Sequence, residues 1–199
     1  MKKNLEHKGS LLGSKSQRPL NQKRADLFQN STGSTEDKLN SFTPYVSRQN
    51  VSKLIAQYEM VKLTSGILGD IVEAGVYYGS GLMGWANIVA SMEPYNYQCQ
   101  IIGFDTFTGS KGVSRKDQIF NKIKRRDGEY KANSFEDLKK SIEIFDEDRP
   151  LSHLDKVKLI KGDIIKTSKN YVKQNPAQTI RILHIGMNFY KPTLYTLKN

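Results

Sequence analysis

Hydrophobic and polar positions in the middle of the chain predict a strand, a helix and a second strand in close succession. Residues 70–76 are mostly apolar and favour β structure. Glycines at positions 75, 79 and 81 end this run just before a helical pattern. Apolar residues then recur at helical spacing: Leu82, Trp85, Ala86 and Val89. The proline at position 94 ends that helix because proline has no N–H to donate, and residues 100–104 form the next apolar run. Two strands joined by a helix predict a right-handed parallel crossover, with a ligand site at the carboxyl ends of the strands.

Further helices are expected on both sides of this unit. Apolar positions at helical spacing over residues 51–61 predict a helix that stops at Gly66. A firmer pattern over residues 135–145 predicts another, with Asn133 or Ser134 as its N-cap. A narrower helical stripe precedes it: Ile119, Phe120 and Ile123. The region 110–150 is thus either a lid over the site or a structural excursion that covers the sheet.

The last third of the chain predicts two more strands. Apolar runs at 156–160 and 179–185 are the expected strands. A helix capped by Thr167 or Ser168 should follow the first of them and end near Pro176, and residues 191–197 should form another helix. Strands that alternate with helices predict an α/β fold with a parallel sheet.

Two carboxylates stand at the predicted strand ends. Asp105 follows the second strand, where a carboxylate can accept hydrogen bonds from both ribose hydroxyls of a nucleoside. The glycine spacing G-x-x-x-G-x-G differs from the G-x-G-x-x-G of dinucleotide-binding folds. Glu73 lies at the end of the first strand, where its charge suits a cationic ligand that carries an amino group and a sulfonium. The alternative is an ordinary α/β unit in which Glu73 makes a salt bridge.

The stretches VEAGVYYGSG at 72–81 and IIGFDTFTGS at 101–110 resemble the macrocin O-methyltransferase family. Members of that family use S-adenosylmethionine to methylate sugar hydroxyls of natural products. Further matches are the region Tyr45 to Tyr58, KLIKGDIIKT at 158–167 and ILHIGMNFYKPTLYTL at 182–197, so the resemblance runs from about Phe42 to the end of the chain. It implies a Rossmann-like class I methyltransferase sheet with helices on both faces and strands in the spatial order third, second, first, fourth. The family's sheet has seven strands, so we expect this one to be incomplete at the C-terminus.

The resemblance also implies a binding site for S-adenosylmethionine. Glu73 and Gly75 would lie by the methionine end, and Asp105 at the ribose. In class I methyltransferases an acidic residue after the third strand pairs with the adenine amino group and the next apolar residue packs on the ring. The complete set of expected cofactor-binding residues is Glu73, Gly75, Gly79, Ser80, Asp105, Thr106, Asp163 and Ile164.

The chain departs from the family after the fourth predicted strand. The family carries a D-x-D-x-Y-type run there, in which aspartate serves magnesium binding and base catalysis, whereas this chain has Gly186 and Asn188. An amide oxygen can coordinate a hard cation, but it cannot deprotonate a hydroxyl. Magnesium use is therefore doubtful, and no metal-binding residue is predicted. His184 precedes this departure and could serve as a base, but a histidine within a strand is more often in the core or bound to a partner, so no role is assigned to it.

Composition adds a basic arm and limits the location. The chain has 199 residues and a net charge of +11. Residues 1–41 are rich in lysine, asparagine, serine, glycine and glutamine, and we interpret them as a disordered or loosely attached arm that precedes a methyltransferase-like domain over 42–199. Cys99 is the only cysteine, which excludes disulfides within the chain. No run of about eighteen apolar residues exists, so we expect a cytoplasmic protein without a membrane span.

Three functions follow, in order of preference. The first is an S-adenosylmethionine-dependent O-methyltransferase that acts on a sugar or similar hydroxyl of a small molecule. The second is a catalytically impaired or inactive remnant that still binds the cofactor, alone, as a homo-oligomer or with a completing partner. The third is a basic nucleic-acid-binding protein, drawing on the arm and on the cluster Lys122, Lys124, Arg125 and Arg126. Neither basic segment has the interleaved aromatic residues that stack bases, so only weak non-specific attraction to nucleic acid is expected.

Overall fold

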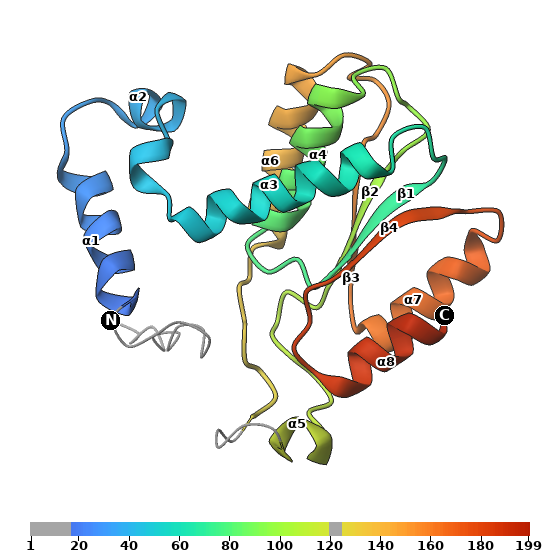
Figure 1. The fold of residues 1–199 in the computed structure, drawn as a ribbon. Coiled ribbons are helices and arrows are strands. Elements are labelled where there is room, and N and C mark those ends of the chain that lie inside the picture. Colours follow the sequence, from blue (N-terminus) through green and yellow to red (C-terminus); the bar gives the residue numbers. More distant parts are fainter. Residues whose placement is uncertain (1–16, 120–124) are drawn as a thin grey trace. The chain divides into compact units, whose positions relative to one another are not determined.

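The computed structural model describes residues 17–119 and 125–199, and the chain forms two compact units, Met1–Ala56 and Gln57–Asn199 (Figure 1). The first unit contains α1 (Gln17–Asn30), α2 (Thr35–Asn40), the 3-10 helix η1 (Thr43–Tyr45) and the start of α3 (Arg48–Leu63). Residues 1–16 and 120–124 lie outside the described part. Most lysines of the basic arm and two lysines of the cluster at 122–126 therefore fall outside it as well. The same holds for the apolar stripe predicted at 119–123, except for Ile119.

The described part of the predicted arm is helical. Ser34 caps α2 through a reciprocal capping box with Asp37, whose backbone N–H donates to the Ser34 hydroxyl at 3.1 Å. The Lys38 ammonium donates to the Phe28 carbonyl at 2.7 Å, and the rings of Phe28 and Tyr45 meet edge to face at 5.2 Å. These contacts order residues 17–45 locally, a structure that their composition does not predict. The interpretation of this segment as loosely attached stays a prediction.

The second unit is built on a parallel sheet of four strands in the order β3-β2-β1-β4. The strands are β1 (Asp70–Ala74), β2 (Ile101–Asp105), β3 (Val157–Lys161) and β4 (Ile180–Ile185). The predicted spatial order is confirmed, with β1 in the interior of the sheet. In the described chain β4 pairs only with β1, so it forms one edge of the sheet.

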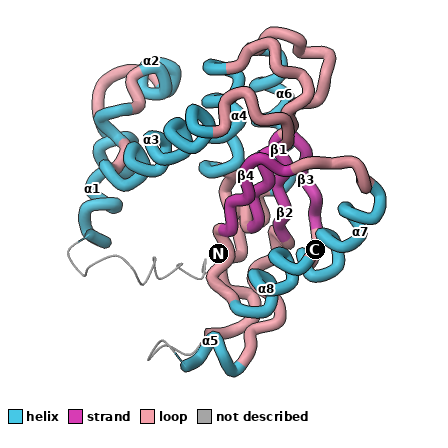
Figure 2. Tube along the Cα trace, turned by 45° about the vertical axis from the view of Figure 1, so that its right-hand side comes forward, coloured by secondary structure: helices cyan, strands magenta, loops and turns pink. Residues whose placement is uncertain are grey.

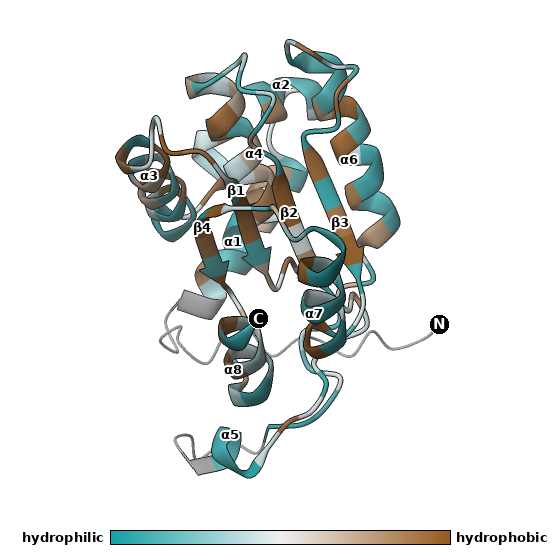
Figure 3. Cartoon of the chain, turned by 90° about the vertical axis from the view of Figure 1, so that its right-hand side faces the viewer, coloured by the Kyte–Doolittle hydropathy of each residue, from teal (hydrophilic) through white to brown (hydrophobic). Residues whose placement is uncertain are grey.

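Helices cover both faces of this sheet (Figure 2). On one face, α4 (Ser80–Met92) and α6 (Phe135–Asp148) pack over a core that includes Ile71, Leu82 and Trp85. On the other, α7 (Ile164–Gln174) buries Ile164 against Val72 and neighbouring strand residues. There α8 (Tyr190–Lys198) packs beside α7. Figure 3 shows the apolar strands between these two layers. This arrangement is the three-layer α/β architecture that the sequence predicts.

Two predicted helix starts need correction or refinement. The helix after β3 begins at Ile164 instead of near Thr167, because Asp163 caps it: the Ile165 N–H donates to the Asp163 carboxylate at 3.1 Å. Ser134 precedes α6 as predicted, but its hydroxyl makes no capping bond and donates instead to the Tyr77 carbonyl. The weak stripe before α6 corresponds only in part to α5 (Arg115–Ile119).

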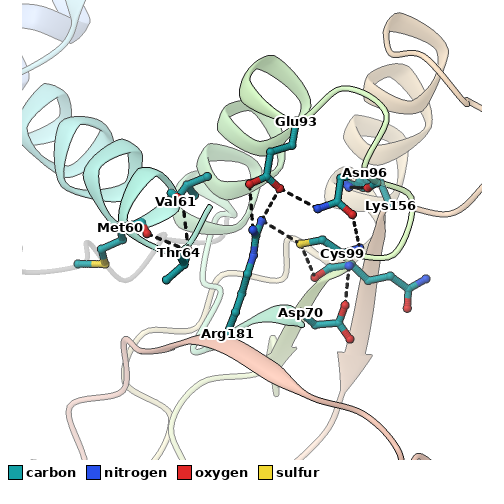
Figure 4. A network of polar contacts seen from close by, with 10 residues as sticks. Met60, Val61, Thr64, Asp70, Glu93, Asn96, Cys99, Lys156 and Arg181 are labelled. Carbon is teal, nitrogen blue, oxygen red and sulfur yellow. Dashed lines mark hydrogen bonds and ion pairs between the residues drawn. The ribbon is translucent and has the colours of Figure 1, made fainter. Parts of the chain in front are cut away.

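At the amino ends of the strands a polar network links β1, α4 and β4 (Figure 4). The Arg181 guanidinium donates to both carboxylate oxygens of Glu93, at 3.0 and 2.9 Å, and to the Cys99 sulfur at 3.3 Å. The Asn96 side chain donates to Glu93 at 2.8 Å, and Asp70 accepts from the Gln100 N–H at 2.6 Å. The Arg181 side chain is 1% exposed, so this ion pair lies in the interior, where its partners have to be supplied by the protein.

Candidate functional site

The carboxyl ends of β1 and β2 are joined by the carboxylate of Asp105. One of its oxygens accepts from the backbone N–H groups of Val76 and Tyr77, both at 2.8 Å, and the other accepts from the Phe107 N–H at 2.7 Å. These bonds fix the turn after β1, in which Tyr77 has a positive φ of 57°. A carboxylate offers about four acceptor positions, so three are used here by the chain itself. Asp105 thus links the carboxyl ends of β1 and β2, and we call its three hydrogen bonds to Val76, Tyr77 and Phe107 the Asp105 clasp.

The glycines of the turn approach other parts of the same chain. Gly75 has a φ of 96°, and a Cβ at this position would lie 3.1 Å from the Met187 side chain, beyond β4. Gly79 precedes α4 with a φ of 84°, and a Cβ there would overlap the Leu138 side chain of α6. Both positions therefore need glycine for conformation and for close packing within the fold. The first turn of α4 beyond them leaves Ser80 exposed, and the early N–H groups of a helix have no intrahelical partner.

Glu73 lies beneath that first turn of α4. Its side chain is 2% exposed, and a Cβ built on Gly81 would overlap both of its carboxylate oxygens. The Gln57 amide donates to the Gly81 carbonyl at 2.9 Å and so packs on the same turn. In the sequence, Gly81 stands out only as one of the glycines between the first strand and the helix, whereas its missing side chain makes room for the Glu73 carboxylate.

His184 faces Glu73 across the β1–β4 pairing, where the two residues are direct register partners. Its Nδ1 lies 3.3 Å from a Glu73 oxygen, and its ring lies 6.0 Å from that of Trp85. The sequence left His184 without a role, and the pairing of Glu73 fits the salt-bridge alternative considered for it. The strand order is the signal that could have identified the contact between Glu73 and His184. Because β4 lies beside β1, residues that are register partners on the two strands come next to each other.

The remaining predicted cofactor residues lie at the same edge of the sheet. Asp163 follows β3 after Gly162 and caps α7, and Ile164, the first residue of α7, is 5% exposed and packs in the core. Thr106 follows β2, and its hydroxyl donates to the Gly109 carbonyl at 2.6 Å. The topology therefore brings the predicted residues of β1, β2 and β3 to one edge, although Ile164 serves the core there.

The segment between β2 and α6 reaches across this edge. The Asn133 N–H donates to the Phe107 carbonyl at 3.0 Å, and the Tyr130 ring lies 6.4 Å from Tyr77 and 6.3 Å from Phe189, which follows β4. Burial, together with the neighbouring Tyr78 and Tyr130, raises the pKa of Tyr77 above its usual value. The sequence predicted either a lid or a structural excursion, and these contacts place the segment against the turn and the end of β4.

The chain beyond β4 offers few ligands for a metal. Gly186 has no side chain, and its N–H donates to the Ala74 carbonyl at 2.8 Å. Asn188 is exposed and contributes at most one amide oxygen. Among the described residues, no group of three or more histidine, cysteine, aspartate or glutamate side chains could hold a metal ion. This donor set does not fit a magnesium site.

Solved structures that resemble this fold are methyltransferases. CalS11, described as a calicheamicin methyltransferase, aligns at a TM-score of 0.86 and 25% identity, covering 94% of this chain and 73% of its own. The apo structure of CalS11, described as a TDP-rhamnose 3'-O-methyltransferase of calicheamicin biosynthesis, aligns at a TM-score of 0.75 and 26% identity with the same coverage. The O-methyltransferase NovP aligns at a TM-score of 0.56 and 21% identity, covering 74% of this chain and 58% of its own. This match supports the fold alone. No protein-family model and no curated protein matches the chain.

This is a Rossmann-like methyltransferase fold. The strand order, the helices on both faces and the coverage of CalS11 agree on it. Within the described ranges 17–119 and 125–199, none of the helices combines the length and the apolar character that a membrane crossing needs.

Proposed function

We propose that this protein is an O-methyltransferase that uses S-adenosylmethionine to methylate a hydroxyl of a sugar-type small molecule, in the manner of the macrocin O-methyltransferase family. The observation that carries the proposal is the Asp105 clasp: a carboxylate at the end of β2 tied to a glycine turn at the start of α4, in a fold whose solved neighbours include CalS11. When bound, S-adenosylmethionine supplies an electrophilic methyl group on a sulfonium.

The residues at the carboxyl edge suit such a cofactor. Glu73 would contribute a buried negative charge near the methionine end. Gly75, Gly79 and Ser80 present the turn and the helix N-terminus. Asp105 keeps one acceptor position for a ribose hydroxyl, with Thr106 beside it. Asp163 and Ile164 would flank the adenine after β3.

A nucleotide-linked sugar is the acceptor class that we infer. CalS11 is described as acting on TDP-rhamnose, and this chain aligns with it over 94% of its length. Because the residues after β4 do not fit a magnesium ion, no step of the reaction is assigned to one.

Calorimetry with S-adenosylhomocysteine and transfer of labelled methyl groups to TDP-rhamnose test the proposal. We expect the cofactor product to bind and label to appear in the sugar. Binding without transfer to any sugar acceptor would instead support the catalytically impaired remnant, and absence of both would overturn the proposal. Salt-sensitive retention on DNA without cofactor binding would favour the basic nucleic-acid-binding alternative.

A further inference from the structure

Buried polar atoms without partners gather around the contact between Glu73 and His184. Among the described residues, five buried side-chain nitrogen or oxygen atoms have no hydrogen-bond partner, and four belong to residues linked through this contact. They are Gln57 Oε1, Glu73 Oε2, Trp85 Nε1 and His184 Nδ1. Gln57 and Glu73 both pack on Gly81, and Trp85 packs near His184. A group of unsatisfied polar atoms in a native fold calls for an explanation.

The two ionisable members are held face to face. Glu73 and His184 are register partners on adjacent parallel strands, with Nδ1 and Oε2 3.3 Å apart. Gly81 keeps the carboxylate under α4, because any side chain at that position would displace it. In catalytic pairs such distances are often long without substrate and tighten when it binds.

The rest of the His184 side chain reaches the surface. Nδ1 is buried, whereas the His184 side chain as a whole is 31% exposed, so its exposed surface lies on atoms other than Nδ1. The Cε1 atom, bonded to both ring nitrogens, lies 3.7 Å from where a Cβ of Gly186 would be. Gly186 follows the carboxyl end of β4, at the edge where Asp105 and the glycine turn lie. The imidazole therefore lies beside Gly186, at the edge of the sheet that carries the candidate site.

We propose that Glu73 and His184 form a carboxylate–histidine pair in which His184 is the general base for the acceptor hydroxyl. This inference rests on the proposed function. Glu73 accepts a hydrogen bond from the Nδ1–H group and so fixes the tautomer that leaves Nε2 unprotonated, the arrangement by which a carboxylate orients a catalytic imidazole. Nε2 takes the hydroxyl proton while the oxygen forms a bond to the methyl carbon. The carbon–sulfur bond breaks and its electron pair stays on sulfur, which becomes a neutral thioether.

The residues around the site make this role specific to His184. Gly186 carries no side chain, and the Asn188 amide does not accept a proton from a hydroxyl. Asp105 is already bonded to three backbone N–H groups. Among the described residues, the one ion-pair contact of His184 is with Glu73 on β1, and α4 faces it with the uncharged Trp85.

The first test is a long-range ¹H–¹⁵N spectrum of the full chain, with and without S-adenosylhomocysteine. We expect the Nδ1–H tautomer for His184, and its loss in Glu73→Gln. An Nε2–H tautomer in the unmodified protein overturns the inference, whatever the protein does with an acceptor.

The second test is methyl transfer to TDP-rhamnose by His184→Asn, whose amide still donates toward Glu73 but takes no proton. We expect S-adenosylhomocysteine affinity within about threefold of the parent, and transfer reduced by about 10²–10⁴-fold with loss of the ascending limb of the pH–rate profile. Free imidazole should restore part of the rate in His184→Ala. His153→Asn, which changes an exposed histidine, is the matched control and should behave as the parent.

The outcomes separate this inference from the proposed function. An active parent with an equally active His184→Asn variant at every pH overturns the base and leaves the methyltransferase proposal standing. A parent that binds S-adenosylhomocysteine but methylates no sugar acceptor overturns both.

Discussion

The two ends of the sheet in the second unit differ in how their buried ionisable side chains are paired. At the amino ends of the strands, Arg181 is almost completely buried, and its two terminal nitrogens donate to Glu93 and Cys99, whereas its Nε has no hydrogen-bond partner among the described residues. At the carboxyl ends, Glu73 Oε2 and His184 Nδ1 lie 3.3 Å apart, and neither atom has a hydrogen-bond partner among the described residues. Arg181 and Glu93 form two hydrogen bonds that stabilise their buried charges, whereas Glu73 and His184 lie close together without one. We therefore expect substitutions at the amino ends to change mainly stability, and we propose that the chemistry lies at the carboxyl ends.

The largest effect should come from breaking the amino-end network. Arg181→Ala leaves Glu93 without its cation in a mostly buried position, and removing one partner of a buried ion pair typically costs about 3–5 kcal/mol. Urea unfolding measures this loss. Lys139→Ala is the control, because the side chains of its ion pair are exposed, that of Lys139 by 51% and that of Glu136 by 72%. The free energy of unfolding of this variant should stay within about 0.5 kcal/mol of the parent. Equal effects of the two variants would remove the distinction between the two ends.

At the carboxyl end, Asp105→Ala should weaken binding of S-adenosylhomocysteine. The variant loses the clasp on the Val76 and Tyr77 N–H groups and the proposed acceptor for a ribose hydroxyl. Loss of a charge-assisted hydrogen bond costs about 1.5–3 kcal/mol, which is roughly tenfold or more in affinity by calorimetry. Asp148→Ala, which removes an exposed carboxylate at the end of α6, should leave the affinity unchanged. Undiminished binding by the Asp105 variant would contradict the site assignment.

Gly81→Ala tests whether the buried carboxylate is held under α4. The added methyl group overlaps the Glu73 oxygens, and overpacking of a well-packed site typically costs about 1–3 kcal/mol. Thermal unfolding measures the change. In Gly81→Ala/Glu73→Ala the overlap is relieved, so the two substitutions should be strongly non-additive. Simple additivity would show that the glycine is required for another reason.

The smallest effect is the pH dependence contributed by Glu93. Burial acts to raise its pKa, but hydrogen bonds from Arg181 and Asn96, with the nearby positive charges, outweigh it and hold the pKa below the usual value of 4.5. The folded state therefore gains stability from ionised Glu93 above about pH 4.5, and this gain is lost as the pH falls through the lowered pKa. Urea unfolding between pH 6 and 3 should show a shallower loss in Glu93→Gln than in the parent. Identical slopes would contradict the assignment.

Much of this molecule follows from local sequence. The apolar runs predicted all four strands within one or two residues, and the helical patterns placed α3, α4 and α6. Parallel topology then brought Asp105 and Asp163 to one edge, because every parallel strand ends on the same side of the sheet. The departure at Gly186 and Asn188 was also visible in the residues themselves.

What only the tertiary structure decided concerns distant partners. Glu73 reads as an isolated charge in a strand until β4 is laid beside β1 and His184 comes opposite it. Gly79 and Gly81 have their reasons in Leu138 and in Glu73, neither of which a local pattern connects to them. Asp105 is a residue of β2 in the chain and a clasp for the turn after β1 in space. Local preference acts over a few residues, whereas these contacts depend on strand order and register, which packing of the whole sheet determines.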